Sequence, residues 1–297
     1  MFKASLNQLL VPIDFSPASK QAFLYAAGLA HSLQAKLTLL HVHKPGGFEP
    51  FVPVLMQQAL LANKEEEALE HFAAMELELP AEYLGTVELD IEMAVGPVLE
   101  QIQLCQERIE ADLIVMGMRG GNRPFQKLWG SNTTRLIQQT DCPVLAVPEH
   151  ISFEGINKMV YATNFEQGDI RAVNYLVQLS QILQAKFHCV HIDLHQDGNH
   201  ALKSNILQEA YAHEVVMDQL EVQAIDGDSV SEGLNTYLAE GEQVILAMLT
   251  HDRGLWERLF QSSTTKAFAK QAKVPVLALQ EAWIHAKPLP SSNHHHL

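Results

Sequence analysis

Apolar runs of strand length alternate along this chain with longer segments whose apolar positions recur at helical spacing. In the first half, the pattern predicts strands at 9–13, 37–42, 87–95, 113–116 and 144–147. Between them it predicts helices at 17–33, 54–79, 97–110 and 131–140. Strands separated by helices favour parallel pairing with right-handed crossovers, so we expect an α/β fold.

The same pattern occurs twice. Leu-Gln-Ala-Lys stands at 33–36 and again at 183–186, an offset of 150 positions, and the Pro-Val-Leu-Ala of 143–146 returns at 275–278. Duplication of one domain explains both matches. We therefore expect two tandem doubly wound domains, each a five-stranded mostly parallel sheet with helices on both faces. Their predicted bounds are 1–150 and 156–285, and 286–297 is expected to be a disordered tail.

The composition of the chain argues against nucleic-acid binding and membrane insertion. A formal net charge of −15 argues against nonspecific nucleic-acid binding, which depends on Lys and Arg contacts to phosphate. No apolar run reaches the roughly 18 residues of a membrane span, so no membrane insertion is expected. The three cysteines are far apart and lack C-x-x-C spacing, which is typical of buried thiols in a reducing compartment. We therefore expect a cytoplasmic protein.

One segment carries a glycine pattern together with positive charge. Residues 117–135 read GMRGGNRPFQKLWGSNTTR, with glycines spaced as G-x2-G-x9-G, four Arg or Lys residues and no acid. A predicted strand precedes the segment, and a predicted helix that Ser131 could cap follows it. Glycines allow close backbone approach to an anion, and the N–H groups of a first helical turn point toward it. The segment predicts a phosphate site; the alternative is an ordinary glycine-rich surface loop.

The spacing excludes the commoner nucleotide motifs, since neither G-x-x-x-x-G-K-[ST] nor G-x-G-x-x-G occurs. Asp14 ends the first predicted strand and would share a crevice with the glycine loop if the first and fourth strands were neighbours. A carboxylate there suits a ribose hydroxyl pair or a magnesium ion. The alternative role of Asp14 is to stabilise the start of the following helix.

Three sequence motifs together resemble the universal stress protein family: Val11-Pro12-Ile13-Asp14, Leu40-His41-Val42, and Met116-Gly117 through Gly130-Ser131. The resemblance covers nearly the whole chain as a tandem pair, and it implies ATP binding, with or without Mg²⁺, in the half that keeps the glycines. It assigns Asp14 to the ribose or adenine side and the backbone around Val42 to the adenine edge. The residues it implies for nucleotide binding are Pro12, Ile13, Asp14, Val42, Met116, Gly117, Arg119, Gly120, Gly130, Ser131, Asn132 and Thr133.

The resemblance also implies how the two halves meet. Pairs of such domains associate through their last strands, so 144–147 and 276–279 are expected to pair around an internal two-fold as a pseudo-dimer. The sequence leaves open whether the chain associates further into a homo-oligomer.

The second half departs from the nucleotide motif. Asn164 replaces Asp14, and the three glycines meet Met248 or Leu249, His251 or Asp252, and Gln261 or Ser262, depending on where a one-residue gap falls. Side chains at positions that need close backbone approach would block the phosphate site. We therefore expect one functional nucleotide site, in the first half.

Histidines gather near the second strand of the second half. His191, Asp193 and His195 would share one face of that strand, and His188 would point the other way. Zinc binding is one interpretation. Structural histidines are the favoured one, because His191 repeats His41 and a straight strand does not bring three alternate side chains onto one ion.

The sequence leaves three hypotheses for function. The favoured one is a cytosolic stress-response protein that binds ATP in the first half, acts as a nucleotide-dependent regulator or chaperone-like partner and turns over slowly at most, because no catalytic base is placed by the motif. The second is a slow ATPase or adenylate-transferring enzyme that uses Asp14, Arg119 and Lys127. The third is a binding module for an apolar ligand, using residues 48–53 or the second crevice.

Overall fold

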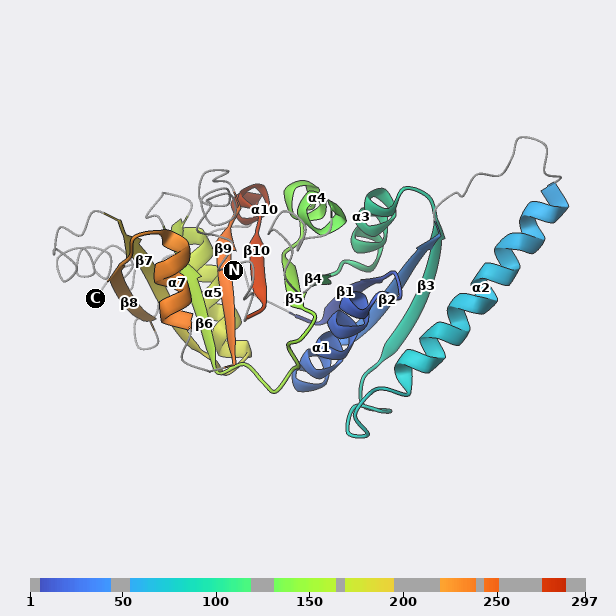
Figure 1. The fold of residues 1–297 in the computed structure, drawn as a ribbon, viewed down its shortest axis with the longest axis horizontal. Coiled ribbons are helices and arrows are strands. Elements are labelled where there is room, and N and C mark those ends of the chain that lie inside the picture. The colour runs from blue at the N-terminus through green and yellow to red at the C-terminus, as the bar shows by residue number, and fades with distance from the viewer. Residues whose placement is uncertain are drawn as a thin grey trace, which may run out of the picture.

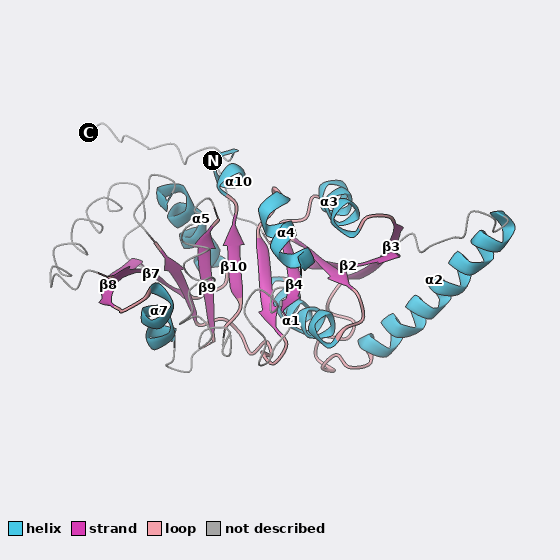
Figure 2. Cartoon of the chain, turned by 45° about the horizontal axis from the view of Figure 1, so that its top comes forward, coloured by secondary structure: helices cyan, strands magenta, loops and turns pink. Residues whose placement is uncertain are grey.

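The computed structural model describes residues 6–43, 54–118, 131–163, 169–194, 220–238, 243–250 and 274–286. These residues form one ten-stranded sheet with helices on both faces (Figure 1, Figure 2). None of the described helices combines the length and the apolar character needed to cross a membrane.

The described residues of the first half form five strands and four helices in alternation, as the sequence pattern predicts. Their bounds are β1 Gln8–Ile13, α1 Pro17–Leu33, β2 Lys36–His43, α2 Val54–Glu76, β3 Leu89–Val95, α3 Val98–Ile109, β4 Leu113–Met118, α4 Ser131–Gln139 and β5 Val144–Pro148.

The described part of the second half likewise has five strands, and α10 follows the last of them. Its bounds are β6 Lys158–Ala162, α5 Asp169–Ile182, β7 Lys186–Asp193, β8 Leu220–Asp226, α7 Val230–Leu238, β9 Val244–Leu249, β10 Val276–Leu279 and α10 Glu281–Ala286.

The strand order is β3-β2-β1-β4-β5 in the first half, and it continues as β10-β9-β6-β7-β8 in the second. Pairing is parallel within each half and antiparallel between β5 and β10, where Leu145 lies opposite Leu277. The predicted fold class and the predicted pairing of the two last strands are therefore confirmed. The exact domain bounds stay a prediction.

In the first half, β1 lies between β2 and β4, and the chain reverses its direction of winding there. This is the switch point at which open parallel sheets bind ligands, outside the carboxyl ends of the strands. The predicted adjacency of the first and fourth strands is confirmed, so Asp14 and the exit of β4 lie at the same edge of the sheet.

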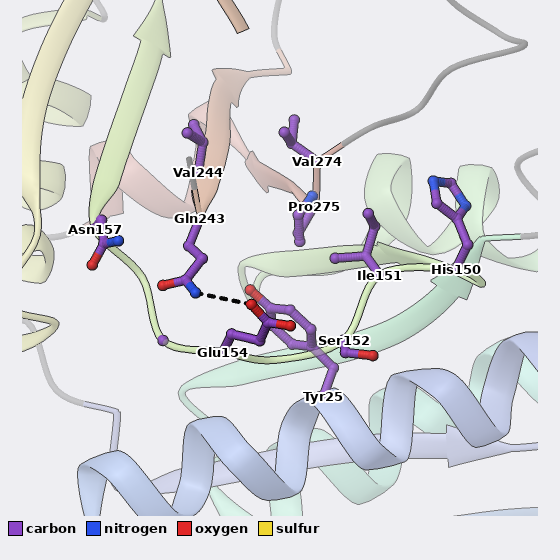
Figure 3. Close-up of a pocket in the computed structure, with 11 residues that line it drawn as sticks. Tyr25, His150, Ile151, Ser152, Glu154, Asn157, Gln243, Val244, Val274 and Pro275 are labelled. Carbon is purple, nitrogen blue, oxygen red and sulfur yellow. Dashed lines mark hydrogen bonds between the residues drawn. The ribbon is translucent and has the colours of Figure 1, made fainter. Parts of the chain in front are cut away.

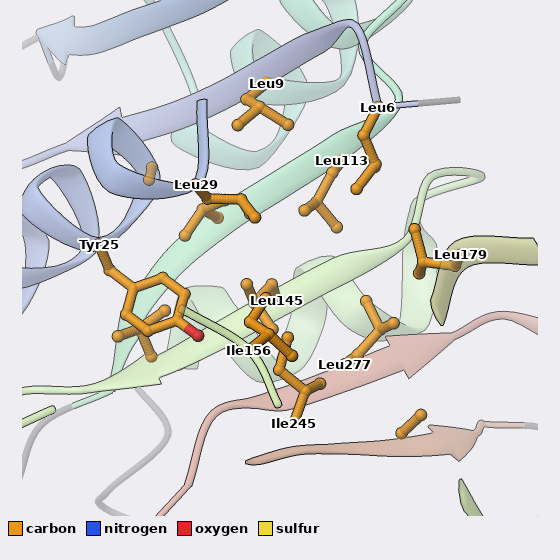
Figure 4. Close-up of a cluster of buried hydrophobic side chains, with 14 of the residues drawn as sticks. Leu6, Leu9, Tyr25, Leu29, Leu113, Leu145, Ile156, Leu179, Ile245 and Leu277 are labelled. Carbon is orange, nitrogen blue, oxygen red and sulfur yellow. The ribbon is translucent and has the colours of Figure 1, made fainter. Parts of the chain in front are cut away.

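Each face of the sheet carries one apolar cluster to which both halves contribute. The first cluster includes side chains from α1, α2, α5 and α10, and the second includes side chains from α3, α4 and α7. Figure 4 shows the first cluster where the halves meet, with Tyr25 and Leu145 near Ile245 and Leu277. The two sequence repeats therefore share their cores.

The repeated Leu-Gln-Ala-Lys sequence has a structural reason. Gln34 ends α1 in the left-handed conformation at φ 55°, and Gln184 follows α5 at φ 54°. The next amide of each, from Ala35 and Ala185, donates to a carbonyl five residues earlier, at 2.9 and 2.8 Å. This is a helix C-terminal capping pattern.

Candidate functional site

The predicted crevice lies at the carboxyl ends of β1 and β4, where a close contact that only glycine allows brings two elements together. A Cβ atom built on Gly117 would overlap the carbonyl group of Ala18, in the first turn of α1. The absence of a side chain therefore lets the end of β4 lie directly against the start of α1. The sequence predicts only a phosphate contact for Gly117. The packing of Gly117 against Ala18 is not predicted by any sequence pattern.

The start of α1 is fixed by a hydrogen-bond network around Asp14. Asp14 Oδ1 accepts from the Ser16 backbone amide at 3.1 Å and from the Ser16 hydroxyl at 2.5 Å. Ser16 caps the helix by accepting from the Ser19 amide at 3.3 Å, and the Ser19 hydroxyl donates to the Ser16 carbonyl at 3.0 Å. Asp14 thus holds the turn, the role given above as the alternative. Its exposed carboxylate is also a preorganised acceptor at the mouth of the crevice.

Phe15 connects this turn to α2. Its backbone has φ 59°, an uncommon conformation for a residue with a side chain. The ring packs against His41 at 4.7 Å, His71 at 4.9 Å and Phe72 at 5.1 Å between centroids. His71 and Phe72 belong to α2, far from Phe15 in sequence, so no local pattern predicts their presence beside the crevice.

Two histidines lie at the end of β2. His41 Nδ1 donates to the Ile13 carbonyl oxygen at 2.8 Å, which fixes the end of β1. His43 is 8% exposed, and its Nε2 has no hydrogen-bond partner in the part of the chain that the structure describes. Burial, with smaller contributions from His41 and Lys64, lowers the pKa of His43, so the neutral imidazole is favoured.

The described residues include only part of the predicted phosphate loop. Arg119, Gly120 and Gly130 lie outside them, as do Arg123 and Lys127. Helix α4 begins at Ser131 itself, one position before the start that a capping role would require. Thr133 is buried, and the side chains of Ser131 and Asn132 are not among those described.

The remaining residues predicted for the nucleotide site have buried or partly buried side chains. Ile13 and Met116 have buried side chains, whereas Pro12 and Val42 are partly buried at the ends of β1 and β2. The structure brings Ile13, Asp14, Val42 and Gly117 to one edge of the sheet, because the strands that carry them are parallel neighbours.

The register of the strands identifies which residue of the second half is the counterpart of Gly117. Leu9 pairs with Leu113 in the first half, and its counterpart Met159 pairs with Ile245 in the second. By this offset, the counterpart of Gly117 is Leu249 and not Met248. The Leu249 side chain is 3% exposed and lies in the apolar core. A large apolar side chain therefore stands at the end of β9 where the end of β4 has none.

The histidines of the second half have structural contacts. His191 Nδ1 donates to the Thr163 carbonyl oxygen at 3.0 Å, which repeats the bond from His41 to Ile13. His188 Nδ1 forms a hydrogen bond of 2.6 Å with the Tyr237 hydroxyl. His195 lies outside the described residues, and within those residues no group of His, Cys, Asp or Glu is arranged to hold a metal ion.

A parallel five-stranded sheet in each half, with a topological switch point at β1 in the first half, defines a doubly wound α/β protein. The model of the universal stress protein family matches residues 6–148. A universal stress protein of Methanocaldococcus jannaschii is 31% identical over 48% of this chain and 81% of its own length. A universal stress protein A homolog of Coxiella burnetii is 30% identical over 48% of this chain and 95% of its own length. The chain belongs to the universal stress protein family, which confirms the resemblance in the motifs.

A solved structure extends the likeness to the second half. The crystal structure of a universal stress protein from Archaeoglobus fulgidus superimposes with a TM-score of 0.69 at 17% identity, and it covers 93% of this chain and 99% of that one. At this identity the likeness concerns the fold, and it includes nearly all of both halves.

Proposed function

We propose that the protein binds ATP at the crevice between β1 and β4 and acts in the stress response as a nucleotide-dependent regulator with little or no hydrolysis. Binding in the first half alone is part of the proposal, with Mg²⁺ as an optional companion of the phosphates. The cytoplasm is its proposed location, and other proteins are its proposed partners.

The observation that carries the proposal is the contact of Gly117 with Ala18. It places the exit of β4, where the glycine pattern begins, against the capped start of α1 and beside Asp14. A nucleotide bound beyond the end of β4 would therefore have its phosphates beside the glycine loop. Its ribose hydroxyls would lie beside the exposed carboxylate of Asp14. In the second half, Leu249 stands at the position of Gly117.

The chain residues have defined tasks in this proposal. The glycines at 117, 120 and 130 would let the backbone approach the phosphates, and the first-turn amides of α4, from Ser131 to Thr133, would donate to them. Arg119 would add positive charge. Asp14, already bonded to Ser16, is fixed in orientation and better suited to hold a hydroxyl than to take a proton from water.

Thermal unfolding with ATP tests the site. At about a hundred times its dissociation constant, ATP should stabilise the native state by roughly 2.7 kcal/mol. For a chain of 297 residues that unfolds as one unit, this corresponds to a rise in melting temperature of roughly 4 °C. Gly130→Val should abolish the rise, because its side chain would occupy the space of the phosphates.

Ser262→Val is the matched control, since the offset that aligns Leu249 with Gly117 makes Ser262 the sequence counterpart of Gly130. It should leave the rise intact, and an equal loss in both variants would contradict a single site. Phosphate release, measured in parallel on wild type and Asp14→Ala, separates a regulator from an enzyme. Turnover well above buffer that disappears in the variant would overturn the non-enzymatic part of the proposal.

A further inference from the structure

A second hollow lies where the two halves meet, away from the glycine loop. It has a volume of about 430 Å³, within the range of small-molecule sites. Figure 3 shows its walls: Tyr25 from α1, the connection between the halves, and the starts of β9 and β10. The residues that line it are Tyr25, His150, Ile151, Ser152, Glu154, Gly155, Asn157, Gln243, Val244, Val274 and Pro275.

Hydrogen bonds hold these walls in place. The Gln21 side chain donates to the Ile151 carbonyl at 2.7 Å, which ties the connection to α1. The Asn157 amide donates to the Gln243 carbonyl at 2.9 Å, and Gln243 Nε2 donates to Glu154 Oε2 at 3.2 Å. A site that is formed before binding does not have to order its walls when a ligand arrives.

Tyr25 provides the observation that points to a ligand. The residue as a whole is 3% exposed, and its hydroxyl makes no hydrogen bond to any residue that the structure describes, but the hydroxyl is not one of the fully enclosed unpaired atoms, so it opens onto the hollow. Its ring packs edge-on against Phe153 at 5.2 Å, and Phe153 in turn occupies the space that a side chain at Gly28 would fill. The hydroxyl therefore cannot turn away to find a partner elsewhere, and in Figure 3 it points into the hollow.

The groups around the hollow define the chemistry of what fits. Burial raises the pKa of Tyr25, so its hydroxyl remains a hydrogen-bond donor. Glu154 offers only acceptors, and Ser152 and Asn157 offer both donors and acceptors. The carboxylate disfavours anions, and an ammonium group could donate to the tyrosine oxygen but would leave the tyrosine hydroxyl proton without an acceptor.

Hydroxyl groups meet both demands, because each donates and accepts. The apolar side of the hollow, from Ile151, Val244, Val274 and Pro275, would contact the C–H face of such a molecule. We propose that this hollow is a binding site for a small uncharged polyhydroxyl compound, of the sugar or polyol class, held by Tyr25 and Glu154. The site is independent of the proposed ATP site.

The test is a titration of the full chain followed through the methyl signals of Ile151, Val244 and Val274 by NMR. The probes are D-ribose, D-glucose and glycerol, with acetate and methylammonium as charged comparisons. At least one neutral probe should shift these signals in a saturable way, and the charged probes should not.

Two variants assign the effect to the hollow. Tyr25→Phe keeps the ring and removes the hydroxyl, and Glu154→Gln changes a solvent-exposed side chain of the connection; each should weaken the affinity about fivefold or more. Tyr175→Phe is the matched control: Tyr175 lies 150 positions after Tyr25, is equally buried, and packs edge-on against Trp283 at 4.9 Å. It should leave the affinity unchanged.

Three results would overturn the proposal. One is the absence of methyl shifts with all three neutral probes. Another is equal binding of acetate or methylammonium. The third is undiminished affinity in both Tyr25→Phe and Glu154→Gln, with circular dichroism showing that each variant is folded.

Discussion

At the scale of single residues, two glycines of the first half allow a group from a distant part of the chain to pack against their backbone. Gly117 admits the Ala18 carbonyl, and Gly28 admits the ring of Phe153. Both neighbours are far away in sequence. The sequence shows the glycine pattern around 117, but which group occupies the space above each glycine is decided by packing.

Replacing Gly117 with alanine tests this packing. Gly117→Ala should lower the free energy of unfolding by about 2 kcal/mol or more, because its Cβ would meet a rigid carbonyl group rather than a mobile side chain. It should also weaken ATP binding, since α1 would be displaced from the end of β4. Urea denaturation and isothermal titration measure the two effects.

Gly85→Ala is the control for that change. A Cβ on Gly85 meets nothing within 4 Å, but the residue has φ 75°. The variant should lose only about 1 kcal/mol from backbone strain and bind ATP normally. Similar effects of both substitutions on ATP binding would show that the contact with Ala18 has no part in the site.

At the scale of elements, the local patterns predict nearly every strand and helix of the first half. The Ser16-Pro17 start of α1 is confirmed, because caps are local signals. A strand is also found in the segment of alternating residues, but it begins at Leu89 and not at Val87, and the apolar Ile91 and Val95 are exposed. The end of α1 is less typical. It uses Gln34 in a left-handed conformation where many helices place glycine.

Gln34→Gly should therefore stabilise the protein by roughly 0.5–1 kcal/mol. Glycine removes the strain of the left-handed backbone in the folded state, and this gain exceeds the cost of the greater conformational entropy that glycine gives the unfolded chain. Chemical denaturation measures the change. Ser32→Gly, two residues earlier within the same helix, should have the opposite sign and cost about 0.5–1 kcal/mol. A destabilising Gln34→Gly would mean that the glutamine side chain contributes more than its backbone costs.

At the scale of the whole molecule, the boundary between the repeats is not a boundary between cores. Both apolar clusters contain residues of both halves, and the β5–β10 pair joins the sheets. The shared cores make separate unfolding of the halves costly, since either half alone would expose one side of each cluster to water.

We expect one cooperative unfolding transition for the full chain. Far-UV circular dichroism follows both halves, and tryptophan fluorescence follows a subset of sites that includes Trp283 on α10. The two transitions in urea should coincide. Separate midpoints would show that the halves are independent despite their common clusters.

The sequence by itself determined the α/β class, the duplication, the order of elements and the family, because each depends on local periodicity or on short contiguous motifs. Tertiary structure decided what depends on distant residues meeting. It set the register that aligns Leu249 with Gly117, and it placed Ala18 against β4. It also placed Tyr25 in the wall of a hollow between the halves. A local pattern specifies which face of a strand or helix is apolar, but it does not specify which side chain of another element will cover it.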